Sequence, residues 1–485
     1  MIDLTINEAV LDSAVETARE RNFRLPTFKQ MRDPLLIPVD VTTRLGSVGL
    51  WDLDPLNLYR INWHNEPTES GGGFGPVNTI EFSRELTGVD ARIVMLVGKW
   101  FPTGAHKVGA AFGCLVPRLV TGQFDPATQK AVWPSTGNYC RGGAYDSNLL
   151  GCESVAILPE GMSRERFEWL EGVAGEILKT PWSESNVKEI FDKCNELTLF
   201  GEDLVIFNQF DEFGNYLWHY SVTGPAMEEV IEAALGHDDT FRAVTLTTGS
   251  AGTIAAGDYL KQVYPTSKIA AGEAVQCPTM LYNGFGEHRI EGIGDKHIPW
   301  VHNVKNTDLA IGLDDEAAMS LIRLFNEPAG IDYLVSQGVK PDLIDQLPLL
   351  GISGAGNLLS AIKLAHYYEM DGSDVIVTVG TDSMEMYGSR LEELNAERGE
   401  FTDLDAAGAY HRYLLGAAID HVHELDYYDR KRIHNLKYYT WVEQQGKTYE
   451  EIQAQWYDDD YWTSVQALAD PIDDLIERFN ARVAG

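Results

Sequence analysis

Short apolar runs alternate with longer segments of helical period between about residue 90 and residue 380. The apolar runs, each bounded by turn residues, are ARIVMLVG, ESVAILPE, RAVTLTTG, SKIAAGEA and DVIVTVG. The longer segments include SRERFEWLEGVAGEIL and AGNLLSAIKLAHYYE. This alternation predicts an α/β fold with a largely parallel sheet. Ligands of such folds bind beside the carboxyl ends of the strands, where the following helices begin.

The two ends of the chain lack this alternation. Residues 1–85 begin with a short amphipathic helical segment, continue with Pro- and Gly-punctuated sequence and include the run GGGFGP at 71–76. We interpret that run as a turn and not as a phosphate loop, because no strand precedes it and a proline follows. After about residue 388 the spacing is mostly helical, with tryptophans at 441, 456 and 462. Both ends are expected to wrap the core or to build an oligomer interface.

The acidic composition narrows the range of partners. Asp and Glu number 73 against 38 Lys and Arg, which gives a formal net charge of −35. Such a field repels phosphate backbones and anionic lipids, so we expect neither a nucleic acid nor a membrane surface as partner. Solubility, as in a saline cytoplasm, is the preferred explanation of the charge. The start of the chain has no signal-peptide pattern and no apolar run reaches about 18 residues, which predicts a cytoplasmic location.

Chain length bounds the number of domains, and the spacing of cysteines and histidines bears on disulfides and metal sites. With 485 residues, 44% of them hydrophobic, the chain can form two or three domains with large cores. Its five cysteines form no CxxC pair, and its histidines have no HExxH spacing. We therefore expect no disulfide framework and no metal site.

The segment TLTTGSAGTIAAGDYLKQ has an apolar run, then small residues, then a helical pattern. The small residues are Gly249, Ser250, Ala251, Gly252 and Thr253. Such a turn lets backbone N–H groups approach an anion at a helix N-terminus, so it is a candidate phosphate site. Tight packing of strand against helix explains the same residues equally well.

Lys107 follows a Pro-Thr-Gly turn in KWFPTGAHKVGAAFG, where an apolar helix is expected to begin. The positive end of the helix dipole and apolar surroundings both lower the pKa of an amine there, which suits imine formation with a carbonyl. The alternative is a lysine whose stem packs on the surface and whose amine reaches water.

Two further turns carry polar groups. In WPSTGNYCRGG, a strand-like run leads to Ser135, Thr136, Gly137 and Asn138, which expose hydroxyl and amide groups that can bind a carboxylate or a phenolic oxygen. In LPLLGISGAGNLLSAIKLA, Ser353 follows an apolar strand-like segment and precedes a long helix, where a hydroxyl can meet a heterocyclic nitrogen. Ordinary Asx turns and helix caps are the alternatives for both.

In this order the four segments resemble the fold-type II pyridoxal-phosphate enzymes, which include cysteine synthase, cystathionine β-synthase, threonine deaminase and tryptophan synthase β. The resemblance covers about residues 90–388. It implies a Schiff base between Lys107 and pyridoxal 5'-phosphate, a bond from Asn138 to the phenolic oxygen, and Ser353 opposite the pyridine nitrogen. It also assigns residues 249–253 to the phosphate cup and residues 135–137 to the substrate loop.

Other segments refine the resemblance. FNQF places Gln209 where cysteine synthases have a glutamine near the substrate carboxylate, and HYSVTGPAMEEV, EGIGDKHIP and VGTDSMEMYGSRL match family segments in order. TGAHK is similar to tryptophan synthase β, but the acidic substrate loop of that family is absent. Tyr139, Cys140 and Arg141 replace the small residues expected after the asparagine. We expect Arg141 either to bind a second substrate carboxylate or to make a structural salt bridge, and Cys140 to be an inert buried thiol.

The resemblance implies two three-layer αβα domains with parallel sheets, as in tryptophan synthase β, and usually a homodimer. Residues 110–222 would form a small mobile domain, and residues 89–109 with 223–388 the large cofactor-binding domain. Residues 1–88 and 389–485 would be an N-terminal extension and a helical C-terminal extension.

The implied reaction is β-replacement or β-elimination on a β-substituted L-amino acid through an aminoacrylate, in the manner of cysteine synthase. The alternatives are an amino-acid ammonia-lyase or dehydratase that yields a keto acid, and a non-catalytic binding protein that carries the cofactor.

Overall fold

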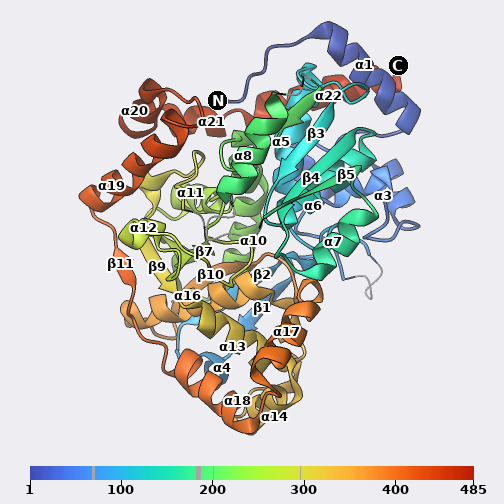
Figure 1. Cartoon of the computed structure of the whole chain (residues 1–485). Helices are drawn as coiled ribbons and strands as arrows, with labels where there is room; N and C mark the ends of the chain where they lie inside the picture. The colour runs from blue at the N-terminus through green and yellow to red at the C-terminus, as the bar shows by residue number, and fades with distance from the viewer. Residues whose placement is uncertain (68–71, 182–186, 200, 202, 295) are drawn as a thin grey trace.

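Two β-sheets organise the chain in the computed structural model, which describes residues 1–67, 72–181, 187–199, 201, 203–294 and 296–485 (Figure 1). One sheet has seven strands in the order β1-β2-β10-β7-β8-β9-β11, and the other has four in the order β5-β4-β3-β6. Gly71 and Asp295, which belong to two of the segments discussed above, lie outside the described residues. The predicted α/β class is confirmed, with extra helices at both ends of the chain.

The four-stranded sheet is entirely parallel and lies at the upper right of Figure 1. Its strands are β3 (Lys130–Pro134), β4 (Glu153–Pro159), β5 (Glu176–Thr180) and β6 (Leu204–Ile206). The helices that accompany it are α5 (Lys107–Thr121), α6 (Asn138–Leu149), α7 (Arg164–Glu171) and α8 (Val187–Thr198). Val132, Val155 and Ile157 of its central strands are buried together against Ile190 of α8.

One prediction of a helix in this region is wrong. The segment SRERFEWLEGVAGEIL was expected to be a single helix, but α7 ends at Glu171 and the last residues enter β5. Gly172 and Gly175 explain the break, because glycine loses the most conformational freedom in a helix. The chain gains instead a parallel pairing of β5 with β4.

The seven-stranded sheet has five parallel central strands between two short antiparallel edge strands. The central strands are β2 (Arg92–Val97), β10 (Asp374–Gly380), β7 (Thr240–Thr247), β8 (Lys268–Ala274) and β9 (Leu309–Leu313). The edge strands are β1 (Thr79–Phe82) and β11 (Val422–Glu424). Both edges come from the predicted extensions, and a three-residue strand such as β11 is too short to give a sequence period.

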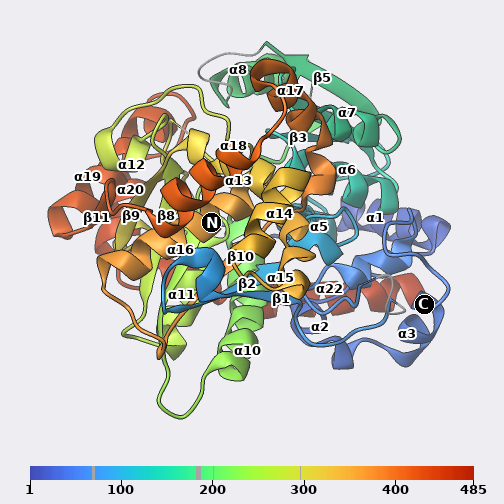
Figure 2. The same cartoon turned by 90° about the horizontal axis from the view of Figure 1, so that it is seen from below.

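Helices cover both faces of this sheet. Ile376 of β10 is buried with Leu358 of α16 (Ile352–Tyr367), whereas the neighbouring Val375 is buried with Ile231 of α10 (Gly224–Ala234). Side chains alternate along a strand, so the two helices lie on opposite faces. Near α16, Figure 2 shows α13 (Asp315–Asn326) and α14 (Pro328–Ser336). With α11 (Ile254–Val263) beside α10, the sheet becomes the middle of three layers.

The apolar segment before Ser353 is not the expected strand. Residues Leu347–Leu349 form a single 3-10 turn, and α16 begins at Ile352. Pro348 has no N–H group to donate to a neighbouring strand, which disfavours a sheet at this position.

Both extensions pack against the core and against each other. The expected amphipathic helix is α1 (Glu8–Arg21), and it contacts α22 (Ala469–Ala484) at the other end of the chain. Lys437 of α19 (Tyr427–Lys437) is fully buried and donates to the backbone oxygens of Trp300 and His302. The extensions are therefore parts of the folded core.

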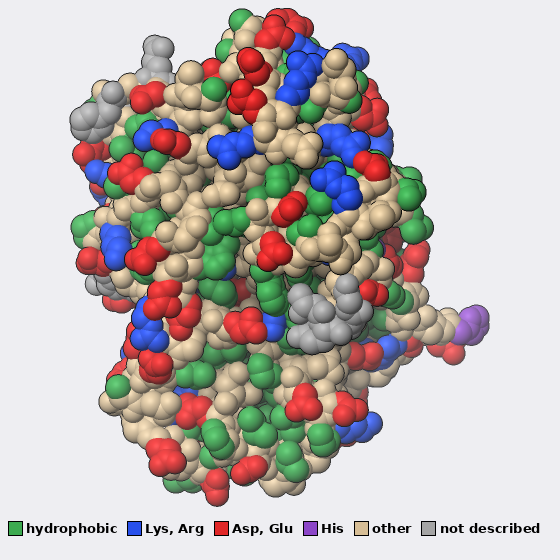
Figure 3. All heavy atoms as spheres, turned by 90° about the vertical axis from the view of Figure 1, so that its right-hand side faces the viewer, with side chains coloured by type: hydrophobic (Ala, Val, Ile, Leu, Met, Phe, Trp, Pro, Cys, Tyr) green, Lys and Arg blue, Asp and Glu red, His purple; other side chains and the backbone are tan. Residues whose placement is uncertain are grey.

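The remaining helices are short. They are α2 (Phe28–Arg32), α3 (Val39–Leu45), α4 (Arg84–Thr87), α9 (Phe213–Trp218), α12 (Thr279–Tyr282), α15 (Pro341–Ile344), α17 (Gly388–Arg398), α18 (Asp403–Ala409), α20 (Tyr449–Tyr457) and α21 (Tyr461–Gln466). No helix among the described residues has the length and apolarity needed to cross a membrane. On the face in Figure 3, acidic side chains are spread widely, with lysines and arginines among them.

Candidate active site

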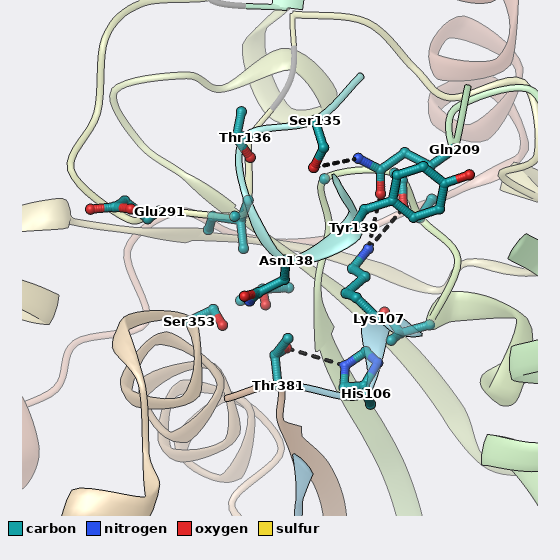
Figure 4. Close-up of a pocket in the computed structure, with 18 of the residues that line it drawn as sticks. His106, Lys107, Ser135, Thr136, Asn138, Tyr139, Gln209, Glu291, Ser353 and Thr381 are labelled. Carbon is teal, nitrogen blue, oxygen red and sulfur yellow. Dashed lines mark hydrogen bonds between the residues drawn. The ribbon is translucent and has the colours of Figure 1, made fainter. Parts of the chain in front are cut away.

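A pocket lies between the two sheets, where the strands of both end (Figure 4). The expected site residues that line it are Lys107, Ser135, Thr136, Asn138, Gln209, Gly249, Ser250, Ala251, Thr253 and Ser353. Five segments that are far apart in the sequence thus meet at one place. Gly137, Arg141 and Gly252 are not part of the lining.

Lys107 is the first residue of α5, and its side chain enters the pocket. Its Nζ donates to Gln209 Oε1 at 3.3 Å and to Ser250 Oγ at 3.1 Å (Figure 4). Burial lowers the pKa of Lys107 to about 8. Both hydrogen-bond partners are neutral, and no described carboxylate forms an ion pair with this amine. A lysine of this kind is neutral often enough to act as a nucleophile or a base.

The turn from β7 to α11 is shaped by close backbone approach. A Cβ atom on Gly249 would lie 2.9 Å from the carbonyl oxygen of Gly292, and one on Gly252 would overlap the Asn215 side chain. Ala251 adopts a left-handed conformation with φ of 60°. The turn leads into the N-terminus of a ten-residue helix, which favours a bound anion.

The loop from β3 to α6 is held by its own hydrogen bonds. Ser135 Oγ accepts from the backbone N–H of Gly137 at 3.1 Å and from Gln209 Nε2 at 3.3 Å. Gly137 has φ of 151°, and a Cβ there would lie 2.6 Å from Arg166 Cδ. Asn138 then begins α6 and donates from Nδ2 to Asp382 Oδ2 at 2.6 Å.

Ser353 enters the pocket from the first turn of α16 and is 4% exposed. Thr381 lies nearby, and its hydroxyl is 3.3 Å from Nε2 of His106. Glu291, the carboxylate among the described lining residues, is paired with Arg166 and Arg390. Ser353 itself presents a neutral hydroxyl to the pocket.

Arg141 does not line the pocket and is held by neighbouring groups. It is 2% exposed, donates from Nη2 to the Thr103 carbonyl oxygen at 2.8 Å, and lies over the Trp169 ring. Its Nη1 is 3.4 Å from Asn138 Oδ1. This geometry supports a structural role and gives no support to binding of a second substrate carboxylate. Cys140 is a buried thiol whose pKa burial raises to about 12.

Several pocket residues were given no role from the sequence. His106, Glu291 and Thr381 line the pocket, as does Tyr139, which the sequence marked only as an unusual bulky residue, and Asp382 lies directly behind Asn138. Burial lowers the pKa of His106 to about 3, so this imidazole is neutral. The sequence did carry a signal for Glu291 and Asp382. One is an acidic residue next to a glycine, in EGIG, and the other lies at the end of an apolar run, in VTVGTD.

A family model described as "Pyridoxal-phosphate dependent enzyme" matches residues 87–336. The chain belongs to this family. The resemblance to fold-type II enzymes is thereby confirmed, and with it the cofactor class.

The relatives of this pyridoxal-phosphate enzyme point to one branch of the family. The cysteine synthase of Staphylococcus aureus (strain N315) is 28% identical over 289 residues, which cover 59% of this chain and 84% of that protein. The cystathionine beta-synthase of Saccharomyces cerevisiae is 24% identical over 326 residues, 65% of this chain and 60% of that protein. The chain is thus similar to cysteine synthases at the level of the family.

Solved structures share the fold. The cysteine synthase of Entamoeba histolytica has a TM-score of 0.55 with 20% identity, covering 69% of this chain and 92% of that chain. The O-acetylserine dependent cystathionine beta-synthase of Helicobacter pylori has a TM-score of 0.54 with 20% identity, covering 64% and 94%.

Proposed function

We propose that this chain is a pyridoxal-phosphate enzyme that exchanges or removes the β-substituent of an L-amino acid, with replacement by a thiol or similar nucleophile as its main reaction. The observation that carries the proposal is Lys107, a buried amine with a lowered pKa and neutral partners. The similarity to proteins named cysteine synthase and cystathionine beta-synthase favours replacement over elimination to a keto acid.

The pocket residues fit the cofactor group by group. The Lys107 amine would hold its carbonyl carbon, and the turn at 249–253 would hold its phosphate, because the crowded glycines bring backbone close to the anion. Asn138 would bond the phenolic oxygen, and Ser353 would face the pyridine nitrogen. When bound, the cofactor supplies a reversible attachment for amino groups and a conjugated ring that accepts electrons.

Lys107 also has the properties of the base for the α-proton. With an amino-acid substrate in the pocket, the Lys107 amine would already lie beside the reacting carbon, so no encounter step would be needed. Its lowered pKa leaves a useful fraction of neutral amine near neutral pH. Gln209 and Ser250 accept its hydrogen bonds and keep it directed into the pocket.

The substrate carboxylate would bind at the loop that begins α6. Ser135 and Thr136 provide hydroxyl groups there, and Gln209 Nε2 lies 3.3 Å from Ser135 Oγ. These donors are neutral, so binding would rest on hydrogen bonds and not on an ion pair. This arrangement suits a monocarboxylate amino acid.

The decisive experiment locates the cofactor and its reaction. Borohydride reduction of the purified enzyme should fix pyridoxal phosphate on the peptide that contains Lys107, and Lys107→Ala should lose the visible absorption band. Incubation with β-substituted amino acids and a thiol should then yield a new thioether. Label on another lysine would reject the site, and pyruvate with ammonia as the main products would favour elimination. Absence of any turnover would favour a binding protein.

We also propose the domain division given by the sequence. The strands of the four-stranded sheet all fall within residues 110–222, and the central strands of the other sheet fall within 89–109 and 223–388. We propose a cytoplasmic homodimer in which the domain of residues 110–222 moves over the pocket. Light scattering of the purified protein tests the dimer.

A further inference from the structure

Asp382 is a buried carboxylate directly behind the pocket wall. It follows β10 by two residues and is fully buried. Its Oδ2 accepts from Asn138 Nδ2 at 2.6 Å and from the Tyr387 hydroxyl at 2.7 Å, and Arg166 lies 3.9 Å away. A buried carboxylate is costly without such partners, and because Oδ1 has no hydrogen-bond partner among the described residues, the contacts of Oδ2 fix its position.

Two glycines leave room for this arrangement. A Cβ on Gly351 would overlap Asp382 Oδ1, and a Cβ on Gly137 would lie 2.6 Å from Arg166 Cδ and Nε. Arg166 in turn donates to the Tyr387 hydroxyl at 2.7 Å and pairs with Glu291. Gly351 thus leaves space for the Asp382 carboxylate, and Gly137 leaves space for Arg166.

The carboxylate determines which way the Asn138 amide points. Asp382 Oδ2 accepts hydrogen bonds from both Asn138 Nδ2 and the Tyr387 hydroxyl, so the nitrogen of the Asn138 amide, and not its oxygen, faces Asp382. The opposite orientation would place the amide oxygen of Asn138 against a carboxylate oxygen of Asp382. It would also remove the hydrogen bond that Arg141 Nη1 donates to Asn138 Oδ1 at 3.4 Å. The nitrogen has a second N–H group, and Asn138 lines the pocket. We propose that Asp382 is a positioning residue, which orients Asn138 so that this second N–H serves as the hydrogen-bond donor to the phenolic oxygen of the cofactor.

The same bond connects the two sheets. Asn138 begins α6 beside the four-stranded sheet, whereas Asp382 follows a central strand of the seven-stranded sheet. Orientation of the donor therefore depends on contact between the two halves of the molecule. The inference rests on the proposed function, because it assigns a donor to the cofactor of that site.

The test compares three variants of the holoenzyme. Asp382→Ala removes the acceptor, Asp382→Asn keeps an acceptor oxygen without the charge, and Asp146→Ala is the matched control. Asp146 is a buried carboxylate on the same helix as Asn138, and neither of its oxygens has a hydrogen-bond partner among the described residues. A donor at the phenolic oxygen favours its ionised form, which absorbs at longer wavelength.

We expect Asp382→Ala to lower the ratio of the long-wavelength to the short-wavelength band of the bound cofactor and to weaken its binding about threefold to tenfold. Asp382→Asn should retain most of the wild-type spectrum, and Asp146→Ala should not change it. In an Asn138→Ala background, Asp382→Ala should add no further spectral change.

Two results would overturn the inference. One is a folded Asp382→Ala enzyme with the wild-type band ratio, and the other is an equal shift in Asp382→Asn, which would make charge and not orientation the cause. If Asp382→Ala does not fold, Asp382→Ser replaces it in the same comparison. Failure of the proposed function is distinct, because the wild-type protein would then show no cofactor band.

Discussion

At the residue scale, the site depends on a lysine whose charged form is disfavoured by burial and on a hydroxyl that is neutral by nature. Lys107 has a lowered pKa because water is excluded around it, and Ser353 contributes a hydroxyl that cannot ionise. Neutral partners around a cofactor favour chemistry in which a leaving group carries electrons away. The following two predictions test these two residues.

The lysine should make the stability of the cofactor-free protein depend on pH. Its pKa is about 8 in the fold and about 10.5 in the unfolded chain, so between these values the unfolded state binds one more proton. Stability should therefore rise with pH across this window. Urea unfolding of wild type and Lys107→Met at both ends of the window measures it, and an equal slope in the two proteins would contradict the lowered pKa.

Replacing Ser353 by Asp should change the electronic state of the cofactor. A nearby anion raises the proton affinity of the pyridine nitrogen, which makes the ring a stronger electron acceptor. We expect kcat to fall and long-wavelength absorbance to grow when substrate is added. Ser353→Ala, which adds no charge, is the control. A Ser353→Asp enzyme with unchanged rate and spectrum would mean that this residue does not face the nitrogen.

At the element scale, each functional group lies where a strand or loop turns into a helix. Lys107 and Asn138 are the first residues of α5 and α6, and Ser353 is in the first turn of α16. The turn at 249–253 precedes α11 in the same way. Parallel strands bring such junctions to one edge of a sheet, so the geometry of each junction controls the pocket.

The loop before α6 gives the prediction at this scale. Gly137→Ala adds a methyl group 2.6 Å from Arg166 at φ of 151°, a conformation that disfavours alanine. We expect the free energy of unfolding to fall by roughly 1–3 kcal/mol. Gly408→Ala is the matched control, because no atom lies within 4 Å of its added Cβ. Equal stability of the two variants in urea would contradict the close packing of this loop.

At the scale of the whole molecule, the two extensions complete the fold. The N-terminal one supplies β1, and the C-terminal one supplies β11 and the buried Lys437. The backbone N–H of Phe28 donates to Asp473 Oδ1 at 2.6 Å, which ties the two extensions together. None of the described residues of either extension lines the pocket.

Removal of the C-terminal extension should therefore damage the fold before it affects chemistry. Deletion of residues 395–485 uncovers the β9 edge and the apolar faces that contact the tail, so we expect aggregation or a changed oligomer. Size-exclusion chromatography and the cofactor spectrum measure the outcome. A well-folded dimer with a normal spectrum and no turnover would instead indicate a catalytic tail.

Local signals in the sequence were sufficient for the fold class and for most of the core elements. Strand–helix alternation predicted the α/β class, whereas the resemblance of four segments to a known family joined Lys107, Asn138 and Ser353 into one candidate site. Short edge strands escaped prediction because they have no period, and Gly172 with Gly175 divided one expected helix. Arg141 was ambiguous, since a buried arginine and a substrate-binding arginine have the same sequence context.

The sequence by itself determined the fold class and the acidic charge, because these depend on residue type and local spacing, and its resemblance to a known family named the candidate junctions of the site. Only the tertiary structure decided which polar side chains meet. Asp382 and Asn138 are 244 positions apart, and Arg166 and Glu291 are 125 apart, yet each pair is in contact and buried. Such distant residues become buried and bind each other only when the two sheets pack together, so no local sequence pattern could predict these contacts.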